Sequence, residues 1–225
     1  MRKVILLLLL SLPAAASAQG DVEYLMEVGG GLGLMSYMGD FNNSPLKHQQ
    51  PMLSALLRRN INPYHGFRLN MSYGKLKGSS SNVETYYPEM AETPYKFDNS
   101  LVDLCATYEY NFWPYGTGRD YRGAKRLSPF ICIGLGVTFV KADKSVFTAN
   151  MPLGFGVKYK LADRLNLGVD WIIHFCLSDK LDGRPDPYSI KSTGMFKNTD
   201  CYSALQATIT YSFMAKCRTC HNEDE

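Results

Sequence analysis

Hydrophobic and polar residues alternate along most of this chain with a period of two. This is the period of a β-strand, because successive strand side chains point to opposite faces. In the segment 165–177, alternate positions are large and apolar: Leu165, Leu167, Val169, Trp171, Ile173, Phe175 and Leu177. The positions between them are mostly small or polar. A soluble sandwich would turn the apolar face inward, whereas a transmembrane barrel turns it toward lipid and fills its lumen with the polar face.

Eight segments carry this alternation, and they predict an all-β protein, an eight-stranded antiparallel up-and-down transmembrane β-barrel. The second segment is the poorest match, because Leu56 breaks the alternation. Glycines at 29, 31 and 33 leave the inner face of the first strand nearly bare, and neither a helix nor a Lys-Ser/Thr pair follows to make them a phosphate-binding loop. The expected strands are 23–38, 52–60, 66–76, 101–112, 129–141, 147–161, 165–177 and 201–213.

The N-terminus has the organisation of a secretory signal peptide. Arg2 and Lys3 precede a short apolar run, and the small residues at 16–18 predict cleavage after Ala18. We therefore expect a signal peptide at 1–18, an outer-membrane barrel at 19–213 and a periplasmic tail at 214–225. No later segment is continuously apolar for the roughly 18 residues of a membrane helix. Secretion together with strand-type membrane segments indicates the outer membrane of a Gram-negative bacterium.

The connections between the expected strands differ in length and in charge. A periplasmic N-terminus would place the connections 39–51, 77–96, 142–146 and 179–200 outside the cell. The tight turns near Pro63 and Asp163 would then be periplasmic, as bacterial barrels prefer. The segment 113–128, WPYGTGRDYRGAKRLS, is long and basic for a periplasmic turn. Two interpretations stay open for it, a docking loop for a partner and a disordered glycine-rich turn.

Charged residues at inner positions predict a lumen closed by ion pairs. An eight-stranded barrel has an interior just wide enough for its own side chains, and an isolated buried charge is very costly. Such a plug disfavours a diffusion pore. The expected lumen ion network is Glu27, Arg58, Arg68, Asp103, Glu109, Lys158, Lys160, Asp170 and His174.

The sequence predicts no catalytic residue, no cofactor and no metal. Asp170 and His174 share one strand face and could orient a proton shuttle, but no serine-centred motif accompanies them, which disfavours an envelope-lipid enzyme. Cys217 and Cys220 form a C-x-x-C in the tail, either as a local disulfide or as spare thiols. Zinc needs about four ligands, and only His221 stands beside them. The net charge is +3 with no clustered basic stripe, so we expect no nucleic-acid partner.

Several longer segments resemble the PorG family of outer-membrane proteins, which belongs to the type IX secretion and gliding-motility machinery. The segments YEYNFWPYGTG (108–118) and LSDKLDG (177–183) are the most specific of them. The others are GGGLGLMSYMGDFN (29–42), NMSYGKLKGSS (70–80), the continuation RDYRGAKRLSPF (119–130), FTANMPLGFGVKYKLADRLNLG (147–168) and FMAKCRTC (213–220).

The resemblance implies a small integral barrel without enzymatic activity that assists the export of cargo proteins. Its expected partners are outer-membrane lipid and a periplasmic ring built from a lipoprotein and a companion subunit. The overlong basic loop then predicts the residues that contact this ring: Trp113, Tyr115, Arg119, Arg122, Lys125 and Arg126. The alternatives are a small porin or receptor barrel for small ligands, and a soluble secreted β-sandwich.

Overall fold

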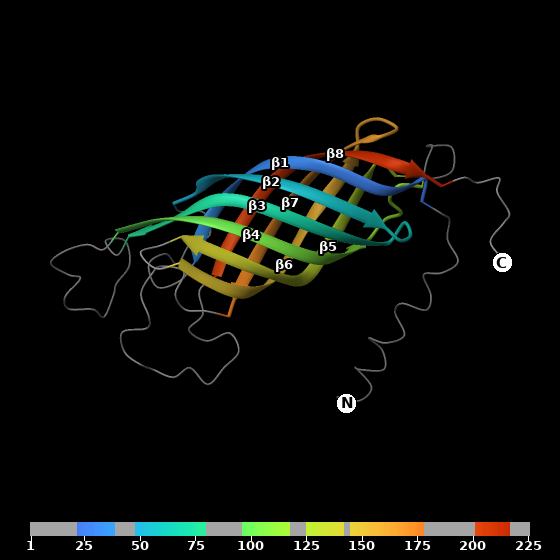
Figure 1. Ribbon diagram of the computed structural model, residues 1–225. Coiled ribbons are helices and arrows are strands. Elements are labelled where there is room, and N and C mark those ends of the chain that lie inside the picture. The colour runs from blue at the N-terminus through green and yellow to red at the C-terminus, as the bar shows by residue number, and fades with distance from the viewer. Residues whose placement is uncertain are drawn as a thin grey trace, which may run out of the picture.

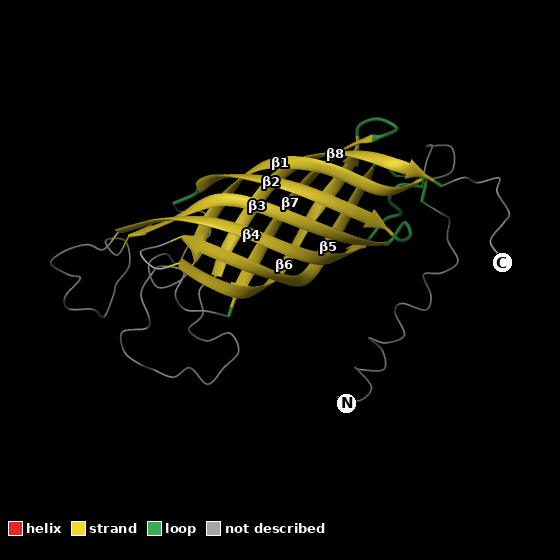
Figure 2. Cartoon of the chain, in the orientation of Figure 1, coloured by secondary structure: helices red, strands yellow, loops and turns green. Residues whose placement is uncertain are grey.

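The computed structural model is a closed barrel of eight antiparallel strands, in which sequence neighbours pair and β8 closes on β1 (Figure 1). It describes residues 22–38, 48–79, 96–117, 125–141, 145–177 and 201–216, and every regular element among them is a strand (Figure 2). The predicted eight-stranded antiparallel barrel is confirmed. The strands are β1 (Tyr24–Met38), β2 (Gln50–Asn60), β3 (His65–Ser79), β4 (Lys96–Asn111), β5 (Leu127–Lys141), β6 (Ser145–Lys160), β7 (Leu165–Cys176) and β8 (Cys201–Ala215).

The barrel has two unlike ends. The turn end holds the turns 61–64 and 161–164, the segment 112–117, and the two ends of the described chain. The opposite end, here the loop end, is where β1, β3, β5 and β7 finish. Within the described ranges, no helix has the length and apolar character to cross a membrane. The predicted signal peptide and the pair Cys217 and Cys220 lie outside the described residues.

Two predicted boundaries are wrong because ladder pairing continues past them. β3 and β4 pair as far as Ser79 and Lys96, so residues 77–79 and 96 of the connection predicted as 77–96 belong to strands. β8 continues through Ala215, which pairs with Tyr24, although we assigned residues 214 and 215 to the tail.

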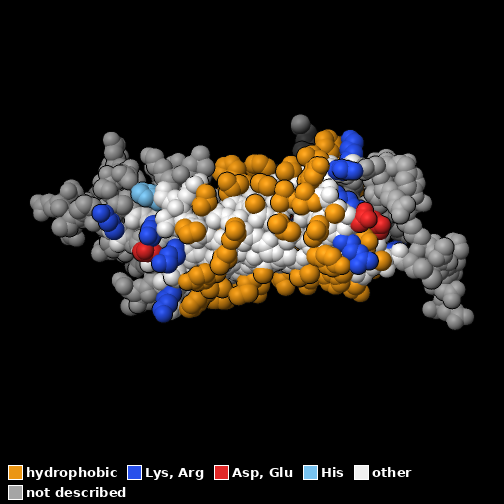
Figure 3. Space-filling view, turned by 90° about the horizontal axis from the view of Figure 1, so that it is seen from above, with side chains coloured by type: hydrophobic (Ala, Val, Ile, Leu, Met, Phe, Trp, Pro, Cys, Tyr) orange, Lys and Arg blue, Asp and Glu red, His pale blue; other side chains and the backbone are white. Residues whose placement is uncertain are grey.

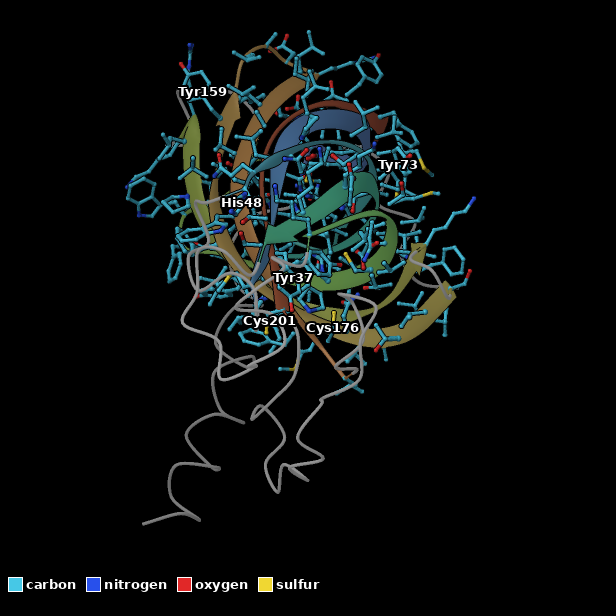
Figure 4. All side chains as sticks on the ribbon, turned by 90° about the vertical axis from the view of Figure 1, so that its left-hand side faces the viewer. Tyr37, His48, Tyr73, Tyr159, Cys176 and Cys201 are labelled. Atoms are coloured by element: carbon cyan, nitrogen blue, oxygen red, sulfur yellow. The ribbon has the colours of Figure 1, made fainter. Side chains whose placement is uncertain are left out.

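The outer surface of the barrel is an apolar band. Leu32, Leu135 and Phe147 leave 68%, 73% and 70% of their surface exposed, an arrangement that suits contact with lipid. Figure 3 shows apolar side chains over the middle of the barrel and Lys and Arg side chains toward both ends. In the view along the barrel, Tyr73 and Tyr159 lie outside the ring of strands, whereas Tyr37 lies inside it and is fully buried (Figure 4).

The bare inner face of β1 allows its neighbours to approach closely. A Cβ atom on Gly29 would lie 2.1 Å from the carbonyl oxygen of Ile209 on β8, which is far inside van der Waals contact. Gly29 also pairs with Leu56 on β2. Leu56 points into the lumen and is 3% exposed, so the residue that breaks the alternation fits beside a position that has no side chain.

Candidate functional site

The half of the lumen nearer the turn end holds a buried network of three carboxylates and three cations. Glu109 is its centre, because its oxygens lie 2.8 Å from Arg58 Nε, 3.1 Å from Arg68 Nε and 2.6 Å from Lys158 Nζ. At the edges, Arg58 pairs with Glu27 and Arg68 pairs with Asp170, each at 2.6 Å. The six charges balance, which is what a low-dielectric interior requires.

Neutral side chains complete the coordination of this network. The amide of Asn60 and the hydroxyl of Thr210 donate to Glu27 at 2.9 and 3.2 Å. Lys158 also donates to Asn111 at 2.9 Å. The Phe130 ring lies near two of the three cations, with its centroid 5.8 Å from Arg68 Cζ and 4.6 Å from Lys158 Nζ.

A second polar cluster surrounds Asp103, farther toward the loop end. Its Oδ1 accepts hydrogen bonds from Thr138, Asn150 and Tyr202 at 3.0, 2.5 and 2.7 Å. Its Oδ2 lies 3.8 Å from His174 Nδ1, and the His174 ring stacks on Tyr202 with centroids 4.4 Å apart. All of these groups are buried, so the cluster joins five strands, β4 to β8, inside the wall.

The loop-end half of the lumen is filled by apolar side chains that the sequence analysis did not identify. The cluster consists of Met35, Tyr37, Met52, Leu76, Leu101, Val140, Cys176, Tyr202 and Ala204, each at most 3% exposed. Tyr202 joins this cluster to the polar one, because its ring packs among the apolar residues while its hydroxyl reaches Asp103. The lumen is thus closed by ion pairs at one level and by apolar packing at another.

Residues 112–117, here the turn-end strap, fold over the turn end of the barrel. The Tyr115 amide donates to the carbonyl of Pro63 at 3.0 Å, and the Glu23 amide donates to the carbonyl of Gly116 at 2.8 Å. Gly116 has a φ of +73°, a conformation that glycine adopts readily. A cavity of about 10 Å³ remains under the strap, room for a single water at most.

Tyr115 of the strap corrects one prediction. We expected its side chain in an exposed docking surface, but it is 3% exposed and its ring centroid lies 4.7 Å from Lys158 Nζ. Burial and the nearby Glu27 carboxylate raise the pKa of Tyr115 well above its usual range, so the phenol is neutral. Its packing against the ionic network explains the burial, and Tyr115 acts as part of the seal.

Three of the other predicted loop residues lie on the outside of the turn end. Trp113 is 38% exposed, and Lys125 Nζ lies 4.2 Å from its ring centroid. Arg126 is exposed, and its carbonyl accepts a hydrogen bond from the Lys160 amide at 2.8 Å. Arg119 and Arg122 lie outside the described residues.

The structure separates some of the remaining predicted residues. Lys160 lies at the rim, 20% exposed, where it pairs with Glu23 at 3.4 Å and not with the central network. Asp170 and His174 do not form the pair that we considered as a proton shuttle, because Asp170 pairs with Arg68 while His174 faces Asp103. Within the described ranges, no three His, Cys, Asp or Glu side chains converge as metal ligands.

A closed eight-stranded barrel with an apolar outer wall and a filled lumen has the fold of the small outer-membrane β-barrels. The chain belongs to the family described as Domain of unknown function (DUF6089), which matches residues 2–222. No curated protein matches the sequence. The resemblance to the PorG family stays a prediction.

A solved structure bears out the barrel fold. The chain is similar to Neisserial surface protein A (NspA), with a TM-score of 0.50 and 14% identity over 84% of this chain and 97% of that chain. It also matches Ail, the attachment invasion locus protein of Yersinia pestis, in complex with a heparin analogue, with a TM-score of 0.47 and 8% identity over 85% and 99% of the two chains. The outer membrane protein OprG from Pseudomonas aeruginosa matches with a TM-score of 0.47 and 10% identity, over 87% of this chain and 99% of that chain. At these identities the likeness to NspA is one of fold.

Proposed function

We propose that this protein is an integral barrel of the outer membrane of a Gram-negative bacterium and a non-enzymatic assembly component of the type IX protein secretion system. In this role it docks a periplasmic ring complex built from a lipoprotein and a companion subunit. The observation that carries the proposal is the filled lumen, in which Glu109, Arg58 and Arg68 are at most 3% exposed. A barrel that passes no solute acts through its surfaces, and this disfavours the porin alternative.

The placement of the barrel in a membrane rests on its outer wall. At the turn end, the apolar band finishes in aromatic residues with polar tips, as in the aromatic girdles of transmembrane barrels. Arg164 donates to the hydroxyls of Tyr24 and Tyr211 at 3.3 and 3.0 Å. On another side of the barrel, His65 bonds the Tyr108 hydroxyl and stacks on its ring. The tight turns at this end favour an orientation in which the turn end faces the periplasm.

The docking surface that we propose is the outer side of the turn end, formed by Trp113, Lys125 and Arg126. An exposed aromatic ring with a cation beside it is typical of residues that contribute strongly to protein interfaces. The strap hydrogen bonds to Pro63 and Glu23 hold the backbone of this surface in place. The resemblance to the PorG family, which covers this segment, supports the ring complex as the partner.

The test is affinity capture of the full chain from detergent-solubilised outer membranes, with the captured proteins identified by mass spectrometry. We expect the wild type to capture the ring lipoprotein and its companion, and the double variant K125E/R126E to lose most of both. The matched control is R59E, which reverses an exposed charge of β2 near the same end. Undiminished capture by K125E/R126E would remove the proposed surface.

A conductance measurement separates the assembly role from the porin alternative. The purified barrel in a planar bilayer should show no ion-conducting steps, because two levels of packed side chains close its lumen. Reproducible unitary conductance would instead favour the porin alternative over the assembly role.

A further inference from the structure

The outer surface changes abruptly from apolar to basic at the loop end of β3, β4 and β5. The last outward-facing apolar side chains on these strands lie side by side, since Tyr73 pairs with Val102 and Val102 pairs with Phe139. Two residues farther along each strand, Lys75 pairs with Ser100 and Ser100 pairs with Lys141. Cationic side chains therefore begin where the apolar band ends.

Four lysines form this basic surface, here called the lysine row: Lys75, Lys77, Lys96 and Lys141. Their side chains are on the outside of the wall, and those of Lys75 and Lys77 are 50% and 42% exposed. On the outer face of these three strands at this end, the only acidic neighbour among the described residues is Asp98, so the row has an excess of positive charge. The described loop-end residues of β1, β2, β6, β7 and β8 include no Lys or Arg.

The one carboxylate within the row shows how these side chains hold an anion. Asp98 lies 3.1 Å from Lys77 Nζ and 4.0 Å from Lys75 Nζ, so two ammonium groups from successive outward positions of β3 converge on it. Lys141 is two strands away from Lys75, about 10 Å at ordinary strand spacing. Long lysine side chains at this separation can reach the same phosphate group or two neighbouring ones.

We propose that the lysine row binds the phosphate groups of a phosphorylated glycolipid of the lipid A type, in the leaflet that surrounds the loop end. This inference rests on the proposed membrane placement of the barrel. The acyl chains of the glycolipid would cover the apolar band below Tyr73 and Phe139, and the phosphates of the glycolipid would then lie level with the lysines. The position of the row beyond the band and its charge select an anionic headgroup. Among the described residues the exposed cations of this end lie on one side of the barrel, which favours a bound lipid over a uniform annulus.

The test is native mass spectrometry of the full-length barrel, purified in detergent and titrated with diphosphorylated lipid A. We expect the triple variant K75Q/K77Q/K141Q to bind about tenfold more weakly than the wild type, because three of the four cations are lost. The charge-conserving variant K75R/K77R/K141R should bind like the wild type. The turn-end variant R59Q, which removes an exposed charge at the other end, is the control and should also bind like the wild type.

Two measurements on the wild type need no variant. Dephosphorylated lipid A should bind far more weakly than the diphosphorylated form, and inorganic phosphate at equal concentration should not displace the lipid. Equal binding by the triple glutamine variant, equal binding of dephosphorylated lipid A, or full displacement by inorganic phosphate would each overturn the proposal. A shift of gel mobility on heating shows that each variant is folded. Because this experiment uses purified protein and lipid alone, its result is independent of whether the ring complex is captured.

Discussion

The two halves of the lumen are filled by opposite chemistry. Near the turn end, Glu109 is surrounded by three cations within an ion network that is almost fully buried. Near the loop end, Leu76, Leu101 and Val140 pack in a cluster of fully buried apolar side chains. A barrel of this size can therefore be closed by balanced charge or by apolar volume. A single substitution acts differently in the two halves. Removing a charge leaves its buried partners unpaired, whereas removing an apolar side chain leaves a cavity.

The largest effect is expected from E109Q. The substitution leaves Arg58, Arg68 and Lys158 facing only Glu27 and Asp170, and breaking a buried ion network in this way costs about 3–5 kcal/mol. Urea titration of the folded barrel in lipid vesicles, followed by tryptophan fluorescence, measures the loss. An unfolding midpoint equal to that of the wild type would show that water or counter-ions reach the network, and that it does not close the lumen.

The next effect is expected in the apolar half, from L101A. Leu101 is fully buried, and removing its side chain leaves a cavity that costs about 2–4 kcal/mol. The volume-conserving variant L101M should cost less than about 1.5 kcal/mol. The same urea titration compares the two. If L101A is as stable as L101M, the loop end contains room for water and the contrast between the halves disappears.

A smaller effect is expected where the halves meet, from Y202F. This substitution keeps the ring in the apolar cluster but removes the hydroxyl that donates to Asp103 at 2.7 Å. Loss of a hydrogen bond to a charged group costs about 1.5–3 kcal/mol, and Thr138 and Asn150, which still donate to Asp103, should hold the loss near the lower value. The double variant Y202F/T138V shows whether the two donors are coupled, and strictly additive losses would argue that they act separately.

The smallest effect is expected for conductance in Y115A. This substitution opens the strap, but the ionic network and the apolar cluster still fill the lumen beneath it. Planar bilayer recordings of Y115A should therefore remain as silent as those of the wild type. Conducting steps in Y115A alone would mean that the strap is the main seal and that the ionic half is permeable.

The alternation of apolar and polar residues was sufficient to predict the strands and the side of the wall on which most residues lie. The same parity also extends to Met35 and Tyr37, which follow Gly29, Gly31 and Gly33 on the inner face of β1. Carried to the end of the strand, it would have placed these two side chains in the lumen. The apolar loop-end cluster was missed because large apolar residues at inner positions look like breaks in the pattern.

Other features depend on contacts between distant residues and leave no periodic signal. The chain returns over the turn end to bury Tyr115, and this depends on backbone hydrogen bonds to Pro63 and Glu23. Strand parity placed Asp170 and His174 on one face, but the tilt and stagger of barrel strands decide which partners each one meets. The presence of charges in the lumen was therefore predictable, whereas the partner of each charge was not.

The strap has a consequence for how the molecule is built. Glu23 accepts a hydrogen bond from the Lys216 amide, and its own amide donates to Gly116, so one residue ties together the beginning, the middle and the end of the folded chain. The bond from Lys216 can form only when β8 pairs with β1. The full set of bonds at Glu23 is therefore present only on a finished cylinder, and a periplasmic protein that contacts this residue would distinguish closed copies from intermediates still being inserted.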